Sequence, residues 1–191
     1  MFLGYFVLLN MNFVIPAYTL LLMYSAVVVI PSLGNPPRLD LRDSVILVST
    51  ALLVHLPLYA FSPRGLSPIY TYVFSAVTAI IEELFFRGYL LKRIGLPLQA
   101  LVFMYSHLSV SDPVFLVNTA LLAPHYFLLG LIAGLIAGEK GFEGSSMFHV
   151  AYNIIGLCYI PQFNVQNVFI LVISDVIAMI FFVWYFWCFN N

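Results

Sequence analysis

The sequence predicts an all-α integral membrane protein, a polytopic bundle of about seven transmembrane helices. Its composition is the first reason, because 63% of the 191 residues are hydrophobic, only 8% are charged, and the mean hydropathy is +1.03. Soluble domains carry about 25% charged residues, and a soluble fold of this length could not bury so much apolar surface. The second reason is that the apolar residues form long runs, and the short segments between them carry most of the charges.

Seven apolar runs approach the length of about 20 residues that a membrane-spanning helix needs. They cover residues 2–30, 44–62, 67–91, 96–110, 114–138, 145–160 and 167–189. We expect Pro16 to kink the first run. Because this run has no basic segment before it, we expect a retained span rather than a signal peptide. The connections are too short for an extramembrane domain.

Basic residues in the short loops predict the orientation, because cytoplasmic loops are enriched in Lys and Arg. With the N-terminus outside, five basic residues fall on the cytoplasmic side: Arg38, Arg42, Lys92, Arg93 and Lys140. Only Arg64 then lies outside, so the predicted topology is N-out and C-in. The basic residues are scattered and the formal net charge is −1, which excludes a nucleic-acid partner and leaves the lipid bilayer as the surrounding medium.

Four charged residues remain inside the predicted spans: Glu82, Glu83, Arg87 and Asp175. An ionised group at the middle of a span costs at least about 2.5 kcal/mol, so each needs a reason. Glu83 and Arg87 are four residues apart, and we expect them to pair on one helix face. Glu82 points to another neighbour. It is either part of a polar cluster that fixes helix packing or a general base.

Two histidines favour the general base. His107 ends the segment Phe103-x-x-x-His107 in the fourth run, and His149 and Asn153 lie one helical turn apart in the sixth. In combination with Glu82 they are typical of acid–base chemistry. His55 and His125 also lie in predicted spans, and we expect structural roles for them; no motif explains Asp175.

Three motifs follow one another on successive predicted spans: Glu82-Glu83-x-x-x-Arg87, Phe103-x-x-x-His107 and His149-x-x-x-Asn153. This order resembles that of the CPBP (Abi) intramembrane proteases, a family that includes the Ras-converting CAAX endopeptidases. The resemblance covers about residues 67–160. It divides the chain into two N-terminal spans in residues 1–66, a catalytic core in 67–160 and a C-terminal span in 161–191.

The resemblance implies a glutamate-type endopeptidase that requires no metal or other cofactor. Glu82 and His107 would activate a water molecule, His149 and Asn153 would donate hydrogen bonds to the oxyanion, and Glu83 and Arg87 would orient the site. The implied substrate is a membrane-associated peptide or protein, and prenylated CaaX tails are the best-known substrates of the family. The helical rise per residue gives the depth of each catalytic candidate in the membrane. The four candidates lie between the cytoplasmic surface and mid-membrane, which predicts a cavity open toward the cytoplasm: Glu82, His107, His149 and Asn153.

Three alternatives stay open. Glu82, His107 and His149 are residue types that could form a metal site. Paired carboxylates and histidines at mid-membrane also occur in ion- or proton-coupled transporters, although these usually show repeated halves, which this sequence lacks. The third alternative is a non-catalytic member of the same family that acts by contact, such as a bacteriocin self-immunity protein.

Overall fold

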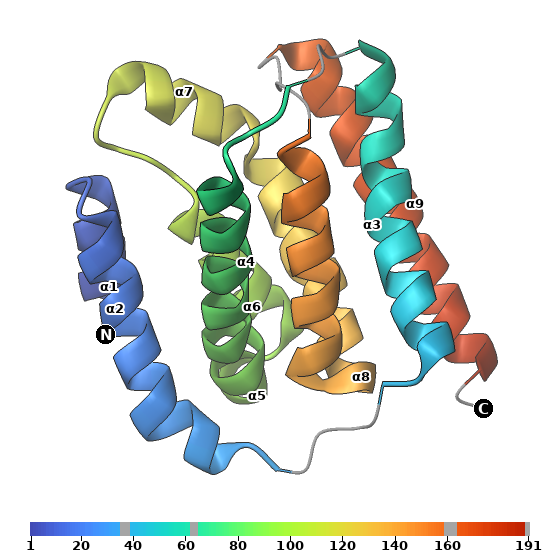
Figure 1. Ribbon diagram of the computed structural model, residues 1–191, viewed down its shortest axis with the longest axis horizontal. Helices are drawn as coiled ribbons and strands as arrows, with labels where there is room; N and C mark the ends of the chain where they lie inside the picture. Colours follow the sequence, from blue (N-terminus) through green and yellow to red (C-terminus); the bar gives the residue numbers. More distant parts are fainter. Residues whose placement is uncertain (35–38, 62–64, 159–163, 190–191) are drawn as a thin grey trace.

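The structure, a computed structural model, describes residues 1–34, 39–61, 65–158 and 164–189. Within these ranges the chain is all-helical, as predicted (Figure 1). Arg38 and Arg64, used above for the orientation, lie outside the described residues. The elements are α1 (Phe2–Asn10), α2 (Val14–Tyr24), η1 (Ser25–Val29), η2 (Ile30–Ser32), α3 (Leu41–Phe61), α4 (Ile69–Glu83), η3 (Leu84–Leu90), α5 (Leu91–Ile94), α6 (Leu96–Ser106), α7 (Pro113–Leu121), α8 (Ala123–Gly156) and α9 (Val165–Phe189).

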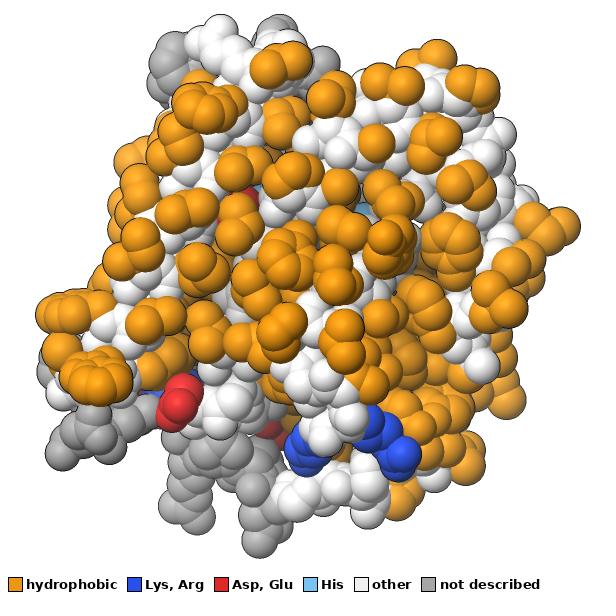
Figure 2. Space-filling model, turned by 180° about the vertical axis from the view of Figure 1, so that it is seen from behind, with side chains coloured by type: hydrophobic (Ala, Val, Ile, Leu, Met, Phe, Trp, Pro, Cys, Tyr) orange, Lys and Arg blue, Asp and Glu red, His pale blue; other side chains and the backbone are white. Residues whose placement is uncertain are grey.

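In the part of the chain that the structure describes, four helices are long and apolar enough to cross a membrane. They are Val14–Ser32, Leu41–Tyr59, Ile69–Ile94 and Val165–Cys188. Many large hydrophobic side chains are exposed, and on the face shown in Figure 2 they cover most of the surface, with the Lys and Arg side chains at the lower end. A surface of this kind is stable only against lipid, so the fold confirms the class of protein that the composition predicts.

The prediction that residues 2–30 form a single spanning helix is wrong. The chain reverses at Met11–Phe13, where Asn12 has φ 62°, and α1 folds back on α2 (Figure 1). Asn tolerates this left-handed conformation better than most residues. Pro16 lies in the first turn of α2, where no backbone N–H has an intrahelical partner, so it fits without a kink.

The predicted spans 114–138 and 145–160 also have different boundaries in the structure. A break at Leu122 separates α7 from α8, and α8 reverses at Gly141, whose φ of 71° favours glycine. The His125 ring contacts Tyr152, and Ile136 lies against Gly144, so residues 123–140 and 142–156 form antiparallel arms. We call them the first and second arms of α8. The fourth predicted span, 96–110, is helical only through Ser106.

The hairpin of α8 is the centre of the bundle, and α3, α4, α6 and α9 pack around it. The Tyr72 hydroxyl of α4 donates to the carbonyl oxygen of Leu157 (3.3 Å), so α4 runs antiparallel to the second arm. Lys92 and Lys140 lie at the opposite end, which we call the basic end. The end near Leu157 is called the far end. This arrangement places the last turn of α4, with its two glutamates, halfway between the ends.

Packing of α6 against the first arm depends on Gly130, and substitution there tests the fold. A Cβ at Gly130 would lie 3.0 Å from the Ala100 Cα, whereas a Cβ at Gly138 meets nothing within 4 Å. Alanine raises helix propensity by about 1 kcal/mol at both positions, but overpacking costs about 1–3 kcal/mol. We therefore expect Gly130→Ala to lower the thermal unfolding temperature in detergent micelles, and Gly138→Ala to maintain or raise it. Equal temperatures for the two variants would contradict this packing.

Candidate active site

Glu82 and Glu83 are the last two residues of α4, and the widened π-helical segment η3 follows them directly. Segments of this kind inside α-helices occur often at functional sites. Consecutive helix residues point in different directions. The two carboxylates therefore meet different neighbours, as the sequence predicts for Glu82.

The Glu82 carboxylate faces the N-terminal hairpin of α1 and α2. The Tyr18 hydroxyl donates to its Oε1 atom at 2.5 Å, and the Tyr5 hydroxyl approaches the same oxygen at 3.3 Å. The other oxygen, Oε2, lies 4.0 Å from His149 Nε2. Sequence reasoning missed both tyrosines. A phenol inside an apolar helix usually has a hydrogen-bond partner, and this was the signal available.

The Glu83 carboxylate is completely buried and joins three elements. Its Oε1 atom lies 2.8 Å from Arg87 Nη1, which confirms the ion pair predicted from the i, i+4 spacing. The same oxygen accepts a hydrogen bond of 2.8 Å from His149 Nδ1 on the second arm of α8. The Arg87 guanidinium lies over the Phe103 ring of α6, 4.3 Å from its centroid. Glu83 thus fixes the orientation of His149.

His107 caps the C-terminus of α6, and its ring is held by a hydrogen bond and by ring stacking. Its Nδ1 atom donates to the Phe103 carbonyl at 2.9 Å, and its ring stacks on Tyr126 with 4.4 Å between centroids. Since Nδ1 carries the proton in this hydrogen bond, a neutral ring has its lone pair on Nε2. His107 is therefore oriented to accept a proton through Nε2.

One cavity of about 390 Å³ brings together all four residues that the motifs single out as catalytic. Its lining includes Glu82, His107, His149 and Asn153. Glu83 and Arg87 do not line it, which suits a supporting position behind His149. The lining also includes His55 and His125, for which the sequence predicts structural roles.

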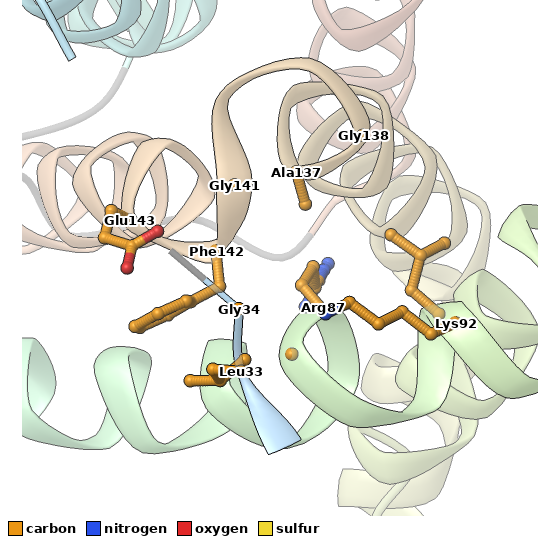
Figure 3. A pocket seen from close by; sticks show the side chains of 11 residues that line it. Leu33, Gly34, Arg87, Lys92, Ala137, Gly138, Gly141, Phe142 and Glu143 are labelled. Carbon is orange, nitrogen blue, oxygen red and sulfur yellow. The ribbon is translucent and has the colours of Figure 1, made fainter. Parts of the chain in front are cut away.

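The lining of this cavity continues toward the far end of the bundle. It runs along the second arm from His149 to Leu157 and along α4 from Glu82 back to Ser75. A second cavity, of about 420 Å³, lies at the basic end beside the reversal of α8. Figure 3 shows Arg87 and Lys92 in its wall, with Glu143 on the other side of Gly141. The buried Glu83–Arg87 pair lies between the two cavities.

Among the described residues, no three His, Cys, Asp or Glu side chains are arranged to hold a metal ion. The site with Glu82, His107 and His149 as ligands is therefore not formed in this arrangement. The Nδ1 atoms of the two histidines are engaged by Glu83 and by the Phe103 carbonyl. Their Nε2 atoms are the ring nitrogens that these hydrogen bonds leave unoccupied.

Comparison with known protein families identifies the central part of the chain. The family model described as type II CAAX prenyl endopeptidase Rce1-like matches residues 64–155, a segment that contains all three motifs. The matched segment is thus similar to the CAAX proteases. This confirms the resemblance to the CPBP proteases, a family of membrane proteases. No curated protein and no solved structure matches the chain.

The matched segment does not contain all the groups that contact the glutamates. The α1–α2 hairpin, with Tyr5 and Tyr18, lies before it. The glutamates are therefore contacted by groups from outside the matched segment as well.

The buried ion pair gives a stability test. Arg87→Met leaves the Glu83 carboxylate without its cation in a dry interior, which typically costs about 3–5 kcal/mol. Arg93→Met is the control, because Arg93 is exposed and stacks on the Tyr89 ring near the basic end. We expect a large drop in the free energy of unfolding in detergent for the first variant and a small one for the second. Similar values for both would show that the pair is not the structural centre.

Proposed function

We propose that the chain is a glutamate-type intramembrane endopeptidase in which Glu82 and His107 activate a water molecule. One observation carries the proposal: a single cavity is lined by a buried carboxylate, two oriented imidazoles and the Asn153 side chain. The family assignment supports the reaction class, because the matched family consists of proteases. It favours hydrolysis over ion-coupled transport.

We assign a role to each group, and the geometry supports the assignment. Both tyrosine hydroxyls engage Oε1 of Glu82, so Oε2 is the oxygen available to take a proton from water. Glu83 holds His149 by Nδ1 and directs Nε2 toward the cavity. In its protonated form His149 donates this Nε2 hydrogen to the developing oxyanion, together with the Asn153 amide. Donors fixed in advance inside a low-dielectric site stabilise such a charge strongly, by about 3 kcal/mol each.

The proposed substrate is a membrane-associated peptide or protein, with a prenylated CaaX tail as the first class to test. Its support is the name of the matched family and the position of Glu82 inside an apolar bundle. The proposed catalytic core remains residues 67–160, flanked by 1–66 and 161–191. Tyr5 and Tyr18 contribute to its site from the first flank.

The proposed topology remains seven spans with N-out and C-in orientation. It rests on the loop charges, because among the described residues four helices are long and apolar enough by themselves. In this orientation the basic end is cytoplasmic, and the cavity nearest the cytoplasm is that of Figure 3. The lining of the Glu82 cavity extends the other way, so it gives no support to the prediction that the active site opens toward the cytoplasm.

Cleavage of a farnesylated CaaX peptide by the purified protein tests the proposed function. We expect the wild type to release the C-terminal tripeptide with or without a chelator, as followed by mass spectrometry. Loss of the general base in Glu82→Gln should slow release by about 10²–10⁴-fold. Glu139→Gln is the control, because it makes the same change at an exposed position near the reversal of α8.

Full activity of Glu82→Gln would contradict the assigned base, and loss of wild-type activity with the chelator would restore the metal alternative. If no sample, including the wild type, cleaved the peptide, the result would favour the transporter or the immunity-type alternative over a CaaX protease.

The two tyrosines on Glu82 give a second test on the same peptide. Tyr18→Phe removes the shorter hydrogen bond to the carboxylate, and a hydrogen bond to a charged group contributes about 1.5–3 kcal/mol. We expect kcat to fall by about tenfold or more, with KM little changed. Tyr24→Phe on the same helix is the control, because the Tyr24 ring packs on Phe85 and Tyr89, away from the cavity. An equal effect of the two substitutions would contradict a positioning role for Tyr18.

A further inference from the structure

His125 and Asp175 form a buried pair that none of the three motifs contains. His125 Nδ1 donates to Asp175 Oδ2 at 2.6 Å, and the Asp175 side chain is completely buried. His125 begins the first arm of α8, whereas Asp175 lies on α9, outside the segment matched by the family. The pair explains the intramembrane charge at Asp175 that the sequence leaves without a role.

The pair reaches the Glu82 cavity through His125 alone. His125 lines this cavity together with Glu82, His107 and Tyr152, and Asp175 stands behind it. Since Asp175 occupies Nδ1, the ring nitrogen available to a molecule in the cavity is Nε2. The Tyr152 hydroxyl, which also belongs to the lining, lies 3.3 Å from this Nε2 atom.

Aromatic rings connect His125 to the other histidine of the same wall. The His125 ring lies 5.1 Å from that of Tyr126, and the Tyr126 ring stacks on His107 at 4.4 Å. Two imidazoles therefore stand on one wall of the cavity, separated by a single phenol ring. Only one of them, His125, has a carboxylate on its outer nitrogen.

We propose, on the basis of the proposed function, that His125 held by Asp175 is the general acid that protonates the leaving amine. In the attack, water transfers one proton to Glu82, and its oxygen bonds to the scissile carbonyl carbon. When the C–N bond breaks, its electron pair takes the Nε2 proton of the His125 imidazolium. The products are a carboxylic acid and an amine. Transfer of the proton from Glu82 to His125 through cavity water restores both groups.

A carboxylate behind an imidazole fixes the ring and stabilises its protonated form, which is the arrangement that acid–base catalysis requires. The rival explanation is a purely structural contact that ties α9 to α8. The second oxygen of Asp175, Oδ1, has no hydrogen-bond partner among the described residues. An unsatisfied buried oxygen costs about 1–3 kcal/mol, which makes the pair a poor choice if its only role were to join two helices.

The test compares two substrates that differ only in the leaving group. One is the farnesylated CaaX peptide with its amide, and the other carries a thioester at the scissile position, from which a thiolate leaves without a proton. His125→Asn keeps a nitrogen donor near Asp175 but cannot deliver a proton. We expect this variant to cleave the amide about 10²–10⁴-fold more slowly and the thioester at nearly the wild-type rate.

Asp175→Asn should show the same preference for the thioester, with a smaller loss on the amide, and it serves if His125→Asn fails to fold. Asp43→Asn is its matched control, because Asp43 is also buried and paired, with Lys140 and Tyr185 at the basic end, away from the cavity. We expect it to affect both substrates equally.

An equal loss on amide and thioester, or no loss on either, would overturn the role of His125. In both cases wild-type cleavage and an inactive Glu82→Gln would leave the proposed function intact. If the wild type cleaved neither substrate, the proposed function and the inference would fall together.

Discussion

Two adjacent carboxylates buried in an apolar bundle each need polar partners. The packing around the site depends on the helices that supply these partners. Glu83 is completely buried and Glu82 almost completely, so protein groups must supply most of their donors. Glu83 binds Arg87, four residues further along the same helix, and His149 on the second arm of α8. Glu82 draws Tyr5 and Tyr18 from the N-terminal hairpin. The glutamates thus link α4 to the N-terminal hairpin and to α8.

This arrangement gives the neighbouring residues Glu82 and Glu83 different environments. Glu83 is enclosed by Arg87 and His149, which suits the proposed supporting role, whereas Glu82 lines the cavity. His149 connects the two functions, because one ring nitrogen faces Glu83 and the other faces Glu82. A few polar side chains that bind one another therefore suffice to form this polar site inside an apolar bundle.

The fold class, the membrane class and the three motifs could be predicted from the sequence, because composition and short-range spacing determine them. The boundaries of spans 2–30 and 114–138 could not. Hydropathy averages over a window and does not detect a reversal at Asn12 or a break at Leu122, which depend on single backbone conformations. The glycine at position 141, in contrast, falls between two predicted spans, as a reversal requires.

The motif residues Glu82, His107, His149 and Asn153 line one cavity, as their shared depth in the membrane suggests. Contacts between distant parts of the chain could not be predicted. Tyr18 lies 64 residues from Glu82, and His125 lies 50 residues from Asp175. Neither contact could be predicted from a sequence spacing or a motif. Such pairs form because each member is buried and polar, and only the packing of helices decides which members meet.

The central claim is that a peptide binds in the cavity beside Glu82, and photo-crosslinking tests it most directly. A farnesylated peptide with a benzophenone next to the scissile bond would be irradiated with the Glu82→Gln variant, and the labelled residues would be mapped by mass spectrometry. We expect labels on cavity residues such as Thr78, Leu122 and Tyr126. Labels confined to Leu33, Phe142 and their neighbours in the cavity of Figure 3, or to the outer surface of α9, would contradict it.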